Sequence, residues 1–339
     1  MALSHHWCFN KFGPPTEVME KGQQSLPKPG SGQAIVAVRA VGLNRSDYLL
    51  MIGQYFPPEQ FPAFLAHEAV GEIVALGPPG DDGENGSKWA VGDRIVVGPL
   101  LIDMPGMGVL RDLGLYDQAS FLPVPQNFSD VEAAAYWTGF LTIAGALEMA
   151  GLGPQSCRSK SLVITAAAGG IGTMCLQVAS AWGAEVTATT RSSTKSKQLE
   201  KLADHVVQCE SPEGLEAGLS ALYPKGVDVI VDPLGGAFVD ASVKALAPGG
   251  QYVGYEWITG PTANYDIKTF LFADATIHGF SLFRLLQHPG LMDRLVQLGL
   301  EYADQLRPCL AETFSFDTAP QAFDALAQSK QVGKITIIV

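Results

Sequence analysis

The chain has 339 residues, of which 47% are hydrophobic, and this is enough apolar material to fill the cores of two domains. Its formal net charge of −12 argues against nucleic acids and membrane surfaces as partners, because both would repel an acidic protein that has no concentrated basic patch. No run of about 18 apolar residues predicts a membrane span. The five cysteines are scattered without a CxxC pair, which favours a reducing compartment, and we expect a cytoplasmic protein.

The part of the chain before about residue 125 is rich in short apolar runs, such as Ala34–Val41, Ala69–Leu76 and Arg94–Val97. Gly and Pro separate these runs, which is typical of short β-strands joined by turns. We therefore expect a β-rich, barrel-like unit, in which the acidic, glycine-rich segment Pro78–Lys88 forms a solvated loop.

From about residue 130, strand-like and helix-like segments alternate. The strand-like segments are Leu162–Thr165, Glu185–Thr190, Val227–Val231 and Gln251–Gly254. This alternation predicts an α/β domain with a doubly wound parallel sheet of the Rossmann type. After about residue 270 the sequence predicts another strand, two amphipathic helices and a closing strand, at Thr276–Phe280, Gly290–Gln305, Ala319–Gln328 and Lys334–Val339.

A glycine-rich turn follows the predicted strand Leu162–Thr165 and reads Ala166-Ala167-Ala168-Gly169-Gly170-Ile171-Gly172. It leads into a helical pattern, which is the context of a dinucleotide-binding fingerprint. The glycines would let backbone approach a pyrophosphate, and the helix N-terminus would offer N–H groups to it. Ala166 replaces the first glycine, so the motif alone is also compatible with an ordinary tight turn. With its context it predicts cofactor binding by Ala168, Gly169, Gly170 and Ile171.

The end of the second predicted strand, at Thr190, indicates which nicotinamide cofactor is bound. NAD-binding proteins place a carboxylate here to hold the ribose 2′-hydroxyl. This chain has Thr190, Arg191 and Lys195 instead, which are suited to a 2′-phosphate and predict NADP(H). The alternative is that Ser193 or Thr194 caps the next helix and Arg191 is solvated.

Several further motifs occur in a characteristic order. They are GLNRSD (42–47), GQY (53–55), AHEAVGEIVALG (66–77), GDRI (92–95), WTGFLT (137–142), the glycine turn and VGKI (332–335). On these motifs the chain resembles the quinone oxidoreductase and enoyl reductase branch of the medium-chain dehydrogenase/reductase superfamily, over essentially its whole length. The resemblance implies a Rossmann NADP(H)-binding domain at 128–269, inserted into a GroES-like substrate domain at 1–127 and 270–339. It also implies a cofactor cleft at their junction and a homodimer.

Zinc-dependent members of this superfamily hold a catalytic metal with a cysteine, a histidine and a second cysteine. Here the corresponding positions are Asn44, His67 and a residue near Ala134, and the cysteine cluster of a structural zinc is missing. We therefore expect no metal. A zinc site of Asp47, His67 and Glu68 is the alternative, since zinc accepts nitrogen and oxygen ligands; otherwise His67 is a hydrogen-bonded residue beside the cleft.

Without a Lewis acid the substrate must already be activated. We expect zinc-independent, NADPH-dependent reduction of a C=C bond conjugated to a carbonyl, in a small-molecule enone or an enoyl thioester. Hydrogen-bond donors would stabilise the charge that forms on oxygen. The alternatives are an NADPH quinone reductase and a non-catalytic NADPH-binding protein, as among eye-lens relatives. The stretch Asp232–Ala241 resembles enoyl reductase domains of polyketide synthases, which favours reduction of an alkene.

Tyr55 and Asn44 are the candidate catalytic residues. Similar enoyl thioester reductases place a catalytic tyrosine in the GxY element, so Tyr55 is the candidate proton donor or oxyanion partner; alternatively it lines an aromatic wall beside Phe56. Asn44 is expected to bind the nicotinamide ribose or the substrate carbonyl, and the alternative is a turn residue at a strand end.

The resemblance also implies further contacts to cofactor and substrate. Thr138 is expected at the nicotinamide carboxamide, or else as a helix-starting residue. Lys334 is expected near the cofactor phosphate, or else as a solvated strand lysine. Gly254 and Tyr255 are expected along the nicotinamide. The substrate cleft is expected at Tyr55, His67, Trp257 and Phe280, with an apolar lining from Trp89, Leu100, Met104, Met107 and Leu110.

Overall fold

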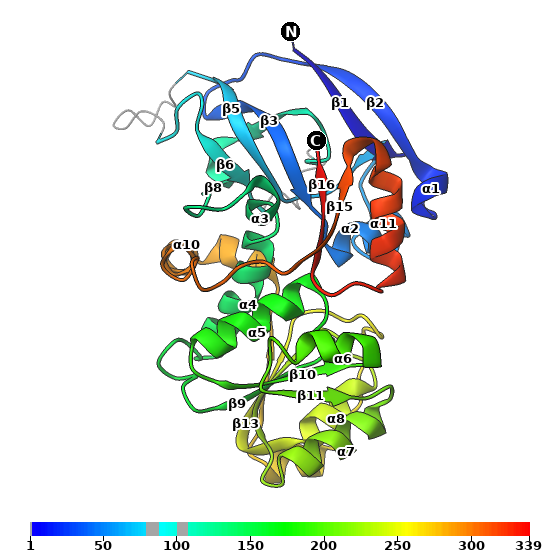
Figure 1. The fold of residues 1–339 in the computed structure, drawn as a ribbon, viewed down its shortest axis with the longest axis vertical. Helices are drawn as coiled ribbons and strands as arrows, with labels where there is room; N and C mark the ends of the chain where they lie inside the picture. Colours follow the sequence, from blue (N-terminus) through cyan, green and yellow to red (C-terminus); the bar gives the residue numbers. More distant parts are fainter. Residues whose placement is uncertain (1, 79–87, 100–107) are drawn as a thin grey trace. The chain divides into compact units, whose positions relative to one another are not determined.

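The computed structural model describes residues 2–78, 88–99 and 108–339. Its contacts divide the chain into two compact units (Figure 1). Unit 1 comprises Met1–Thr138 and Leu310–Val339, and unit 2 comprises Gly139–Cys309. One unit is thus inserted into the other, with boundaries after residues 138 and 309 where the sequence predicts 127 and 269. Most of the predicted loop Pro78–Lys88 lies outside the described residues.

Unit 1 is built mainly of strands. Its strands are β1 (Ala2–Phe9), β2 (Met19–Leu26), β3 (Gln33–Gly42), β4 (Ala63–Phe64), β5 (Ala69–Leu76), β6 (Arg94–Val97), β7 (Leu113–Asp117), β8 (Phe121–Pro123), β15 (Leu310–Ser315) and β16 (Lys334–Ile338). Its helices are α1 (Pro15–Val18), α2 (Arg45–Met51), η2 (Gln118–Ser120), α3 (Asp130–Ala133), η4 (Phe316–Thr318) and α11 (Ala319–Gln328). The predicted β-rich unit is confirmed.

A seven-stranded sheet with the order β15-β16-β3-β5-β6-β8 dominates this unit, and β7 also pairs with β3. The long strand β3 lies at its centre and pairs antiparallel with β5, β7 and β16. The last strand of the chain, β16, is thereby placed beside β3, and this pairing is what brings Lys334 near Asn44. A smaller sheet has the order β2-β1-β4.

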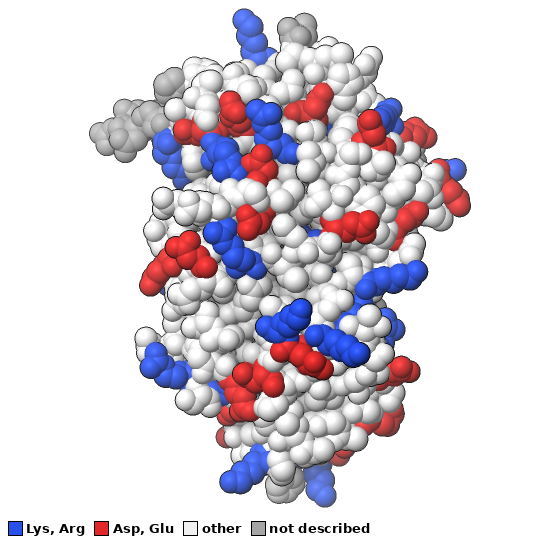
Figure 2. All heavy atoms as spheres, in the orientation of Figure 1, with Lys and Arg blue, Asp and Glu red and all other residues white. Residues whose placement is uncertain are grey.

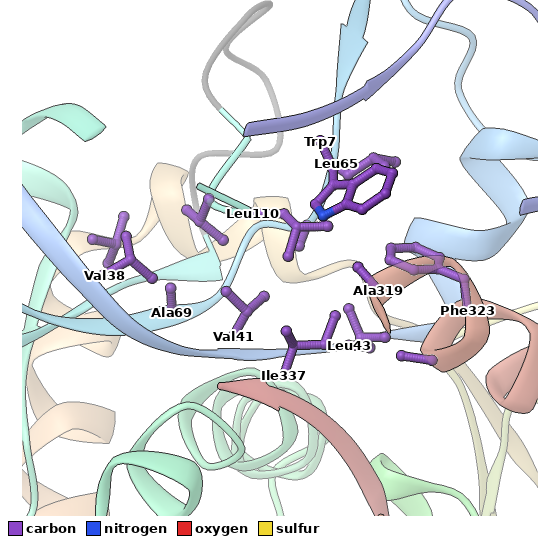
Figure 3. Close-up of a cluster of buried hydrophobic side chains, with 14 of the residues drawn as sticks. Trp7, Val38, Val41, Leu43, Leu65, Ala69, Leu110, Ala319, Phe323 and Ile337 are labelled. Carbon is purple, nitrogen blue, oxygen red and sulfur yellow. The ribbon is translucent and has the colours of Figure 1, made fainter. Parts of the chain in front are cut away.

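Buried apolar side chains from distant parts of the sequence form the core of unit 1 (Figure 3). Val38 and Val41 come from β3, Ile337 from β16 and Phe323 from α11. The buried residues of α11 are Ala319, Ala322, Phe323 and Leu326. Their spacing of three and four residues is that of one helix face, so the predicted amphipathic helix Ala319–Gln328 is confirmed.

Unit 2 alternates strands and helices. Its strands are β9 (Ser161–Ile164), β10 (Glu185–Thr190), β11 (His205–Gln208), β12 (Val227–Asp232), β13 (Leu246–Gly254) and β14 (Thr276–Gly279). Its helices are α5 (Gly170–Ala181), α6 (Ser193–Leu199), α7 (Pro212–Leu222), α8 (Phe238–Lys244), α9 (Ile267–Phe272), η3 (Leu282–Gln287) and α10 (Pro289–Glu301). Helix α4 (Trp137–Met149) begins in unit 1 and continues in unit 2.

The strands of unit 2 form one parallel sheet in the order β11-β10-β9-β12-β13-β14. The order reverses between β9 and β12, which is the Rossmann arrangement, so the predicted fold class is confirmed. The sequence predicts that the strand at Thr276 belongs to the substrate domain. The structure instead pairs it, as β14, with β13 in this sheet.

Charged side chains of both signs are interspersed on the face drawn in Figure 2. Among the helices of the described residues, none combines the length and apolar character that a membrane span requires. All five cysteines are free thiols.

Candidate active site

Glu68 is the centre of a buried polar cluster in unit 1. Its carboxylate is fully buried, immediately before β5. Oε2 accepts a hydrogen bond from Nζ of Lys334 at 3.0 Å, and Oε1 accepts one from the N–H of Thr138 at 2.7 Å. Lys334 is itself only 4% exposed, and its Nζ also donates to Oδ1 of Asn44 at 2.6 Å. The carboxylate thus balances a buried ammonium and binds an N–H in the first turn of α4, where negative charge is favoured.

Asn44 and Asp47 extend this cluster to His67. Asn44 is the N-cap of α2, and its N–H donates to Oδ2 of Asp47 at 2.7 Å. Oδ1 of Asp47 lies 2.6 Å from Nδ1 of His67, and the two side chains are 1% and 13% exposed. A carboxylate at Nδ1 fixes the tautomer and the orientation of an imidazole, and leaves Nε2 for another partner. We call Glu68, Lys334, Asn44, Thr138, Asp47 and His67 the Glu68 cluster.

Two buried polar atoms of this cluster have no hydrogen-bond partner among the described residues. They are Nδ2 of Asn44 and Oγ1 of Thr138. Buried polar groups are almost always hydrogen-bonded, and an unsatisfied one costs about 1–3 kcal/mol. The two atoms belong to residues that the sequence assigns to the nicotinamide, so the cluster offers a donor and a hydroxyl that fit an amide or ribose group.

The donor set of the Glu68 cluster does not suit zinc. Both carboxylate oxygens of Glu68 are engaged by Lys334 and Thr138, and both of Asp47 by Asn44 and His67. In the described parts of the chain there is no group of three or more His, Cys, Asp or Glu residues that could hold a metal ion. The geometry therefore does not support the alternative of a zinc site formed by Asp47, His67 and Glu68.

The glycine turn of unit 2 connects β9 to α5 and has the geometry of a phosphate-binding turn. Gly169 is the N-cap of α5, so Gly170 and Ile171 lie in its first turn, where N–H groups are available to an anion. A Cβ on Gly172 would lie 2.7 Å from Cα of Ala167, which explains why only glycine lets helix and strand approach so closely. Ala168 is 7% exposed beside them.

Ala166 occupies the position of the missing first glycine and has φ of 48°. This is the left-handed region, which costs a residue with a Cβ about 1 kcal/mol or more. The turn therefore keeps the backbone that the fingerprint requires in spite of the substitution.

Asp232 is the centre of a second buried cluster, at the end of β12. Its carboxylate accepts hydrogen bonds from the hydroxyls of Thr165 and Tyr252 and from the N–H groups of Leu234 and Gly235. Burial, together with the charge of Asp232, raises the pKa of Tyr252 above its ordinary value. This Asp232 cluster joins the ends of β9, β12 and β13 beside the glycine turn. Sequence reasoning did not assign it a role; the available signal was an aspartate between a buried strand and the turn Pro-Leu-Gly-Gly.

The end of β10 carries no carboxylate. Thr190 is 7% exposed and accepts a hydrogen bond from the N–H of Ser192. Ser192, rather than Ser193 or Thr194, caps α6 by accepting from the N–H of Lys195 at 3.4 Å. The side chain of Arg191 is exposed. The glycine turn is hydrogen-bonded to β10, because the N–H of Ala167 donates to the carbonyl of Thr189 at 3.1 Å.

The residues that follow β13 are hydrogen-bonded to Asp232 and to the turn directly after it. The N–H of Tyr255 donates to the carbonyl of Asp232 at 3.2 Å, and burial raises the pKa of the Tyr255 phenol well above its usual value. Trp257 is 40% exposed. The N–H of Phe280 donates to the carbonyl of Gly254, and its buried ring packs against Gly145 of α4. Phe280 thus contributes to the packing of unit 2.

Tyr55 follows α2 and is half-buried, with its ring edge-on to that of Phe56 at 4.9 Å between centroids. Of the residues expected to line an apolar cleft, Leu110 is buried in the core of unit 1, with Trp89 packed against that core. The other three, Leu100, Met104 and Met107, lie outside the described residues. Lys334 is not the solvated lysine that the sequence left open, because its ammonium is buried.

Two family models match the chain. Residues 30–126 match the alcohol dehydrogenase GroES-like domain, and residues 170–297 match the zinc-binding dehydrogenase model. The chain belongs to the medium-chain dehydrogenase/reductase superfamily. It is an oxidoreductase of that superfamily that lacks the zinc-binding residues, since Asn44 stands where the first cysteine ligand would be.

The similar sequences fall into two kinds. One is a phenolphthiocerol synthesis polyketide synthase of Mycobacterium bovis, 31% identical over 316 residues, which cover 91% of this chain but 14% of that protein. The chain spans less than a fifth of the length of such synthases. The other is prostaglandin reductase-3 of Bos taurus, 28% identical over 336 residues, which cover 92% of this chain and 82% of that protein.

Solved structures agree in fold over nearly the whole chain. The CurK enoyl reductase has a TM-score of 0.82 at 24% identity and covers 99% of both chains. A mycobacterial protein in complex with NADPH has a TM-score of 0.84 at 22% identity, and the match covers 99% of this chain and 100% of that one.

Proposed function

We propose that this protein is an NADPH-dependent reductase of C=C bonds conjugated to a carbonyl, in an enone or an enoyl thioester, and that it uses no metal. The observation that carries the proposal is the Glu68 cluster. Its carboxylates are committed to hydrogen bonds, while Asn44 and Thr138 present unsatisfied polar atoms. Such a site binds and orients through hydrogen bonds and suits an acceptor that is already activated.

The choice of NADPH over NADH is supported by the end of β10. A 2′-phosphate would find there the exposed Arg191, together with Lys195 and the hydroxyl of Thr190, and no carboxylate to repel it. One similar structure was solved with NADPH.

NADPH, when bound, supplies a hydride to the β-carbon of the substrate. The glycine turn and the first turn of α5 would hold its pyrophosphate, and Asn44 and Thr138 its nicotinamide end. Tyr55 is proposed to donate a hydrogen bond to the substrate oxygen as negative charge develops on it, which lowers the barrier. Gly254, Tyr255 and Trp257 remain proposed contacts at the nicotinamide and substrate, with His67 on the substrate side.

The relatives support the proposed class of substrate. Polyketide synthases and a prostaglandin reductase are both among them. We propose an activated alkene of biosynthetic origin, in the cytoplasm, where free thiols persist.

The experiment is a cofactor and acceptor panel on the unmodified protein and on Arg191→Ala/Lys195→Ala. Each charge-assisted contact contributes about 1.5–3 kcal/mol, so the double variant is expected to bind NADPH at least about tenfold more weakly and NADH unchanged. The control is Lys197→Ala, on the same helix α6. Turnover with crotonyl thioesters or enones supports the proposal. Turnover with benzoquinones alone, or NADPH binding without turnover, would replace it by the quinone reductase or the non-catalytic alternative.

We also propose that the protein is a homodimer formed through the edge of the unit 2 sheet. β14 is the last strand of that sheet, so one side of its backbone is unpaired. Ile277 on β14 and Leu271 and Phe272 on the preceding helix are 37%, 67% and 82% exposed. Sedimentation of Ile277→Lys beside the unmodified protein tests this, and a monomer in both would refute it.

A further inference from the structure

We propose that His67, oriented by Asp47, donates the proton that completes the reduction at the α-carbon. This inference rests on the proposed function and adds a residue role that neither the motifs nor the relatives assign. It starts from the pair of side chains at the edge of the Glu68 cluster, where Nδ1 of His67 lies 2.6 Å from Oδ1 of Asp47.

The carboxylate of Asp47 is fixed in a position that orients the imidazole of His67. Its side chain is 1% exposed, and the N–H of Asn44 holds its second oxygen at 2.7 Å. A buried, fixed carboxylate keeps the proton on Nδ1 and aims Nε2 away from itself. Asn44 is in turn held by Lys334, so the orientation of His67 is connected to the whole cluster.

His67 is the acid–base side chain of this cluster that can reach a substrate. Glu68 and Lys334 are 0% and 4% exposed and neutralise each other, and Asp47 is enclosed. His67 keeps 13% of its side chain exposed, and Asp47 engages its Nδ1, which leaves Nε2 as the ring nitrogen available to a substrate. It is also joined through Asp47 to Asn44, whose Nδ2 is unsatisfied. The proton donor and the proposed cofactor contacts therefore belong to one hydrogen-bonded group.

The proton balance is complete. When the β-carbon gains its hydride, the π electrons of the C=C bond move toward the carbonyl and leave an enolate. The Nε2–H bond of the His67 imidazolium then breaks and a Cα–H bond forms, which leaves neutral His67. Water returns a proton to Nε2 before the next turnover. Overall one alkene, one hydride and one proton become one saturated product, with no further oxidant or reductant.

The test compares His67→Gln with the control His5→Gln. His5 makes the same kind of pair, with Nδ1 2.7 Å from Oδ2 of Asp112, but on the surface, where the side chains are 54% and 38% exposed. For an enone we expect kcat of His67→Gln to fall by about a hundredfold or more, with NADPH affinity unchanged. His5→Gln should match the unmodified protein. A quinone should be affected less, because its protons go to oxygen, where water can deliver them.

Two further measurements separate proton transfer from a structural role. Added imidazole should restore part of the kcat of His67→Ala, which mere repair of packing would not explain. In the cofactor-free protein, the NMR signal of the His67 Nδ1 proton should be shifted downfield by its bond to Asp47, and Asp47→Asn should remove that shift.

The outcomes are distinguishable. An active unmodified enzyme with an unchanged kcat in His67→Gln would overturn this inference and leave the proposed function standing. Activity that disappears on chelation together with one bound zinc would overturn both, because His67 would then be a metal ligand. An unmodified protein that reduces no acceptor would refute the proposed function, while the NMR comparison would still test the Asp47–His67 pair.

Discussion

Glu68 in unit 1 and Asp232 in unit 2 are both fully buried carboxylates that tie loops together, and their hydrogen bonds are of different kinds. Asp232 in unit 2 receives four hydrogen bonds from hydroxyl and N–H groups, all neutral. Glu68 in unit 1 receives one from an N–H group and one from the ammonium of Lys334. Around Asp232 every carboxylate bond is internal to the protein, whereas beside Glu68 the side chains of Asn44 and Thr138 keep unsatisfied atoms.

The comparison indicates how a scaffold differs from a binding site. A saturated cluster has nothing left to offer a ligand, and it fixes the turn that leads from β12. A cluster with unsatisfied groups is less favourable in the free protein and recovers that cost when a ligand arrives. We therefore interpret the Asp232 cluster as structural and the Glu68 cluster as both structural and functional.

The largest effect is expected from Glu68→Gln. It leaves the ammonium of Lys334 buried without a counter-charge, which costs about 3–5 kcal/mol of unfolding free energy. Urea unfolding measures this, and Glu72→Gln is the control, because Glu72 pairs with Arg39 at 3.1 Å on the surface and should cost at most about 1 kcal/mol. Equal losses of unfolding free energy in the two variants would contradict the argument that burial makes the Glu68–Lys334 pair costly to break.

Asp232→Asn should have the next largest effect. It turns four charge-assisted hydrogen bonds into weaker ones and presents an amide NH₂ to donors, so we expect a loss of about 1.5–3 kcal/mol. Asp228→Asn is the control, since Asp228 also accepts from two donors of Ser161 but is 41% exposed. If Asp232→Asn lowers NADPH affinity without lowering stability, the interpretation of this cluster as a scaffold is wrong.

Thr138→Val should have the smallest effect on stability and a distinct effect on binding. Its hydroxyl is buried without a partner in the described structure, so replacing it with a methyl group should remove that penalty and raise the unfolding free energy of the free protein by about 1 kcal/mol. The loss of one hydrogen bond to the cofactor should weaken NADPH binding roughly two- to tenfold. Ser242→Ala removes another buried hydroxyl without a partner, far along the chain in α8, and should leave NADPH affinity unchanged. Unchanged affinity in Thr138→Val would exclude Thr138 as a cofactor contact.

Local patterns in the sequence were sufficient to predict much of the fold. The strand Glu185–Thr190 and the helix Ala319–Gln328 have the bounds expected from the sequence. The helix pattern reflects burial of one face, whereas the strand is buried on both faces after Glu185. The glycine turn was also predictable, since its backbone demands lie within seven residues, and Ala166 adopts the left-handed conformation there. The absence of zinc ligands could be read directly from Asn44.

The site itself was decided by the tertiary structure. Asn44, Glu68 and Lys334 are separated by up to 290 positions, and only the pairing of β16 with β3 brings them together. From the sequence, Lys334 could be either a cofactor contact or a solvated lysine. The residues next to a charged side chain in the sequence do not show which group it pairs with in the folded protein. Asp47 and His67 are likewise 20 positions apart in a motif that suggests metal binding. Whether such residues bind a metal or one another depends on which carboxylate oxygens already accept hydrogen bonds within the protein. Those hydrogen bonds form only in the folded structure, where the strands of unit 1 bring the residues together.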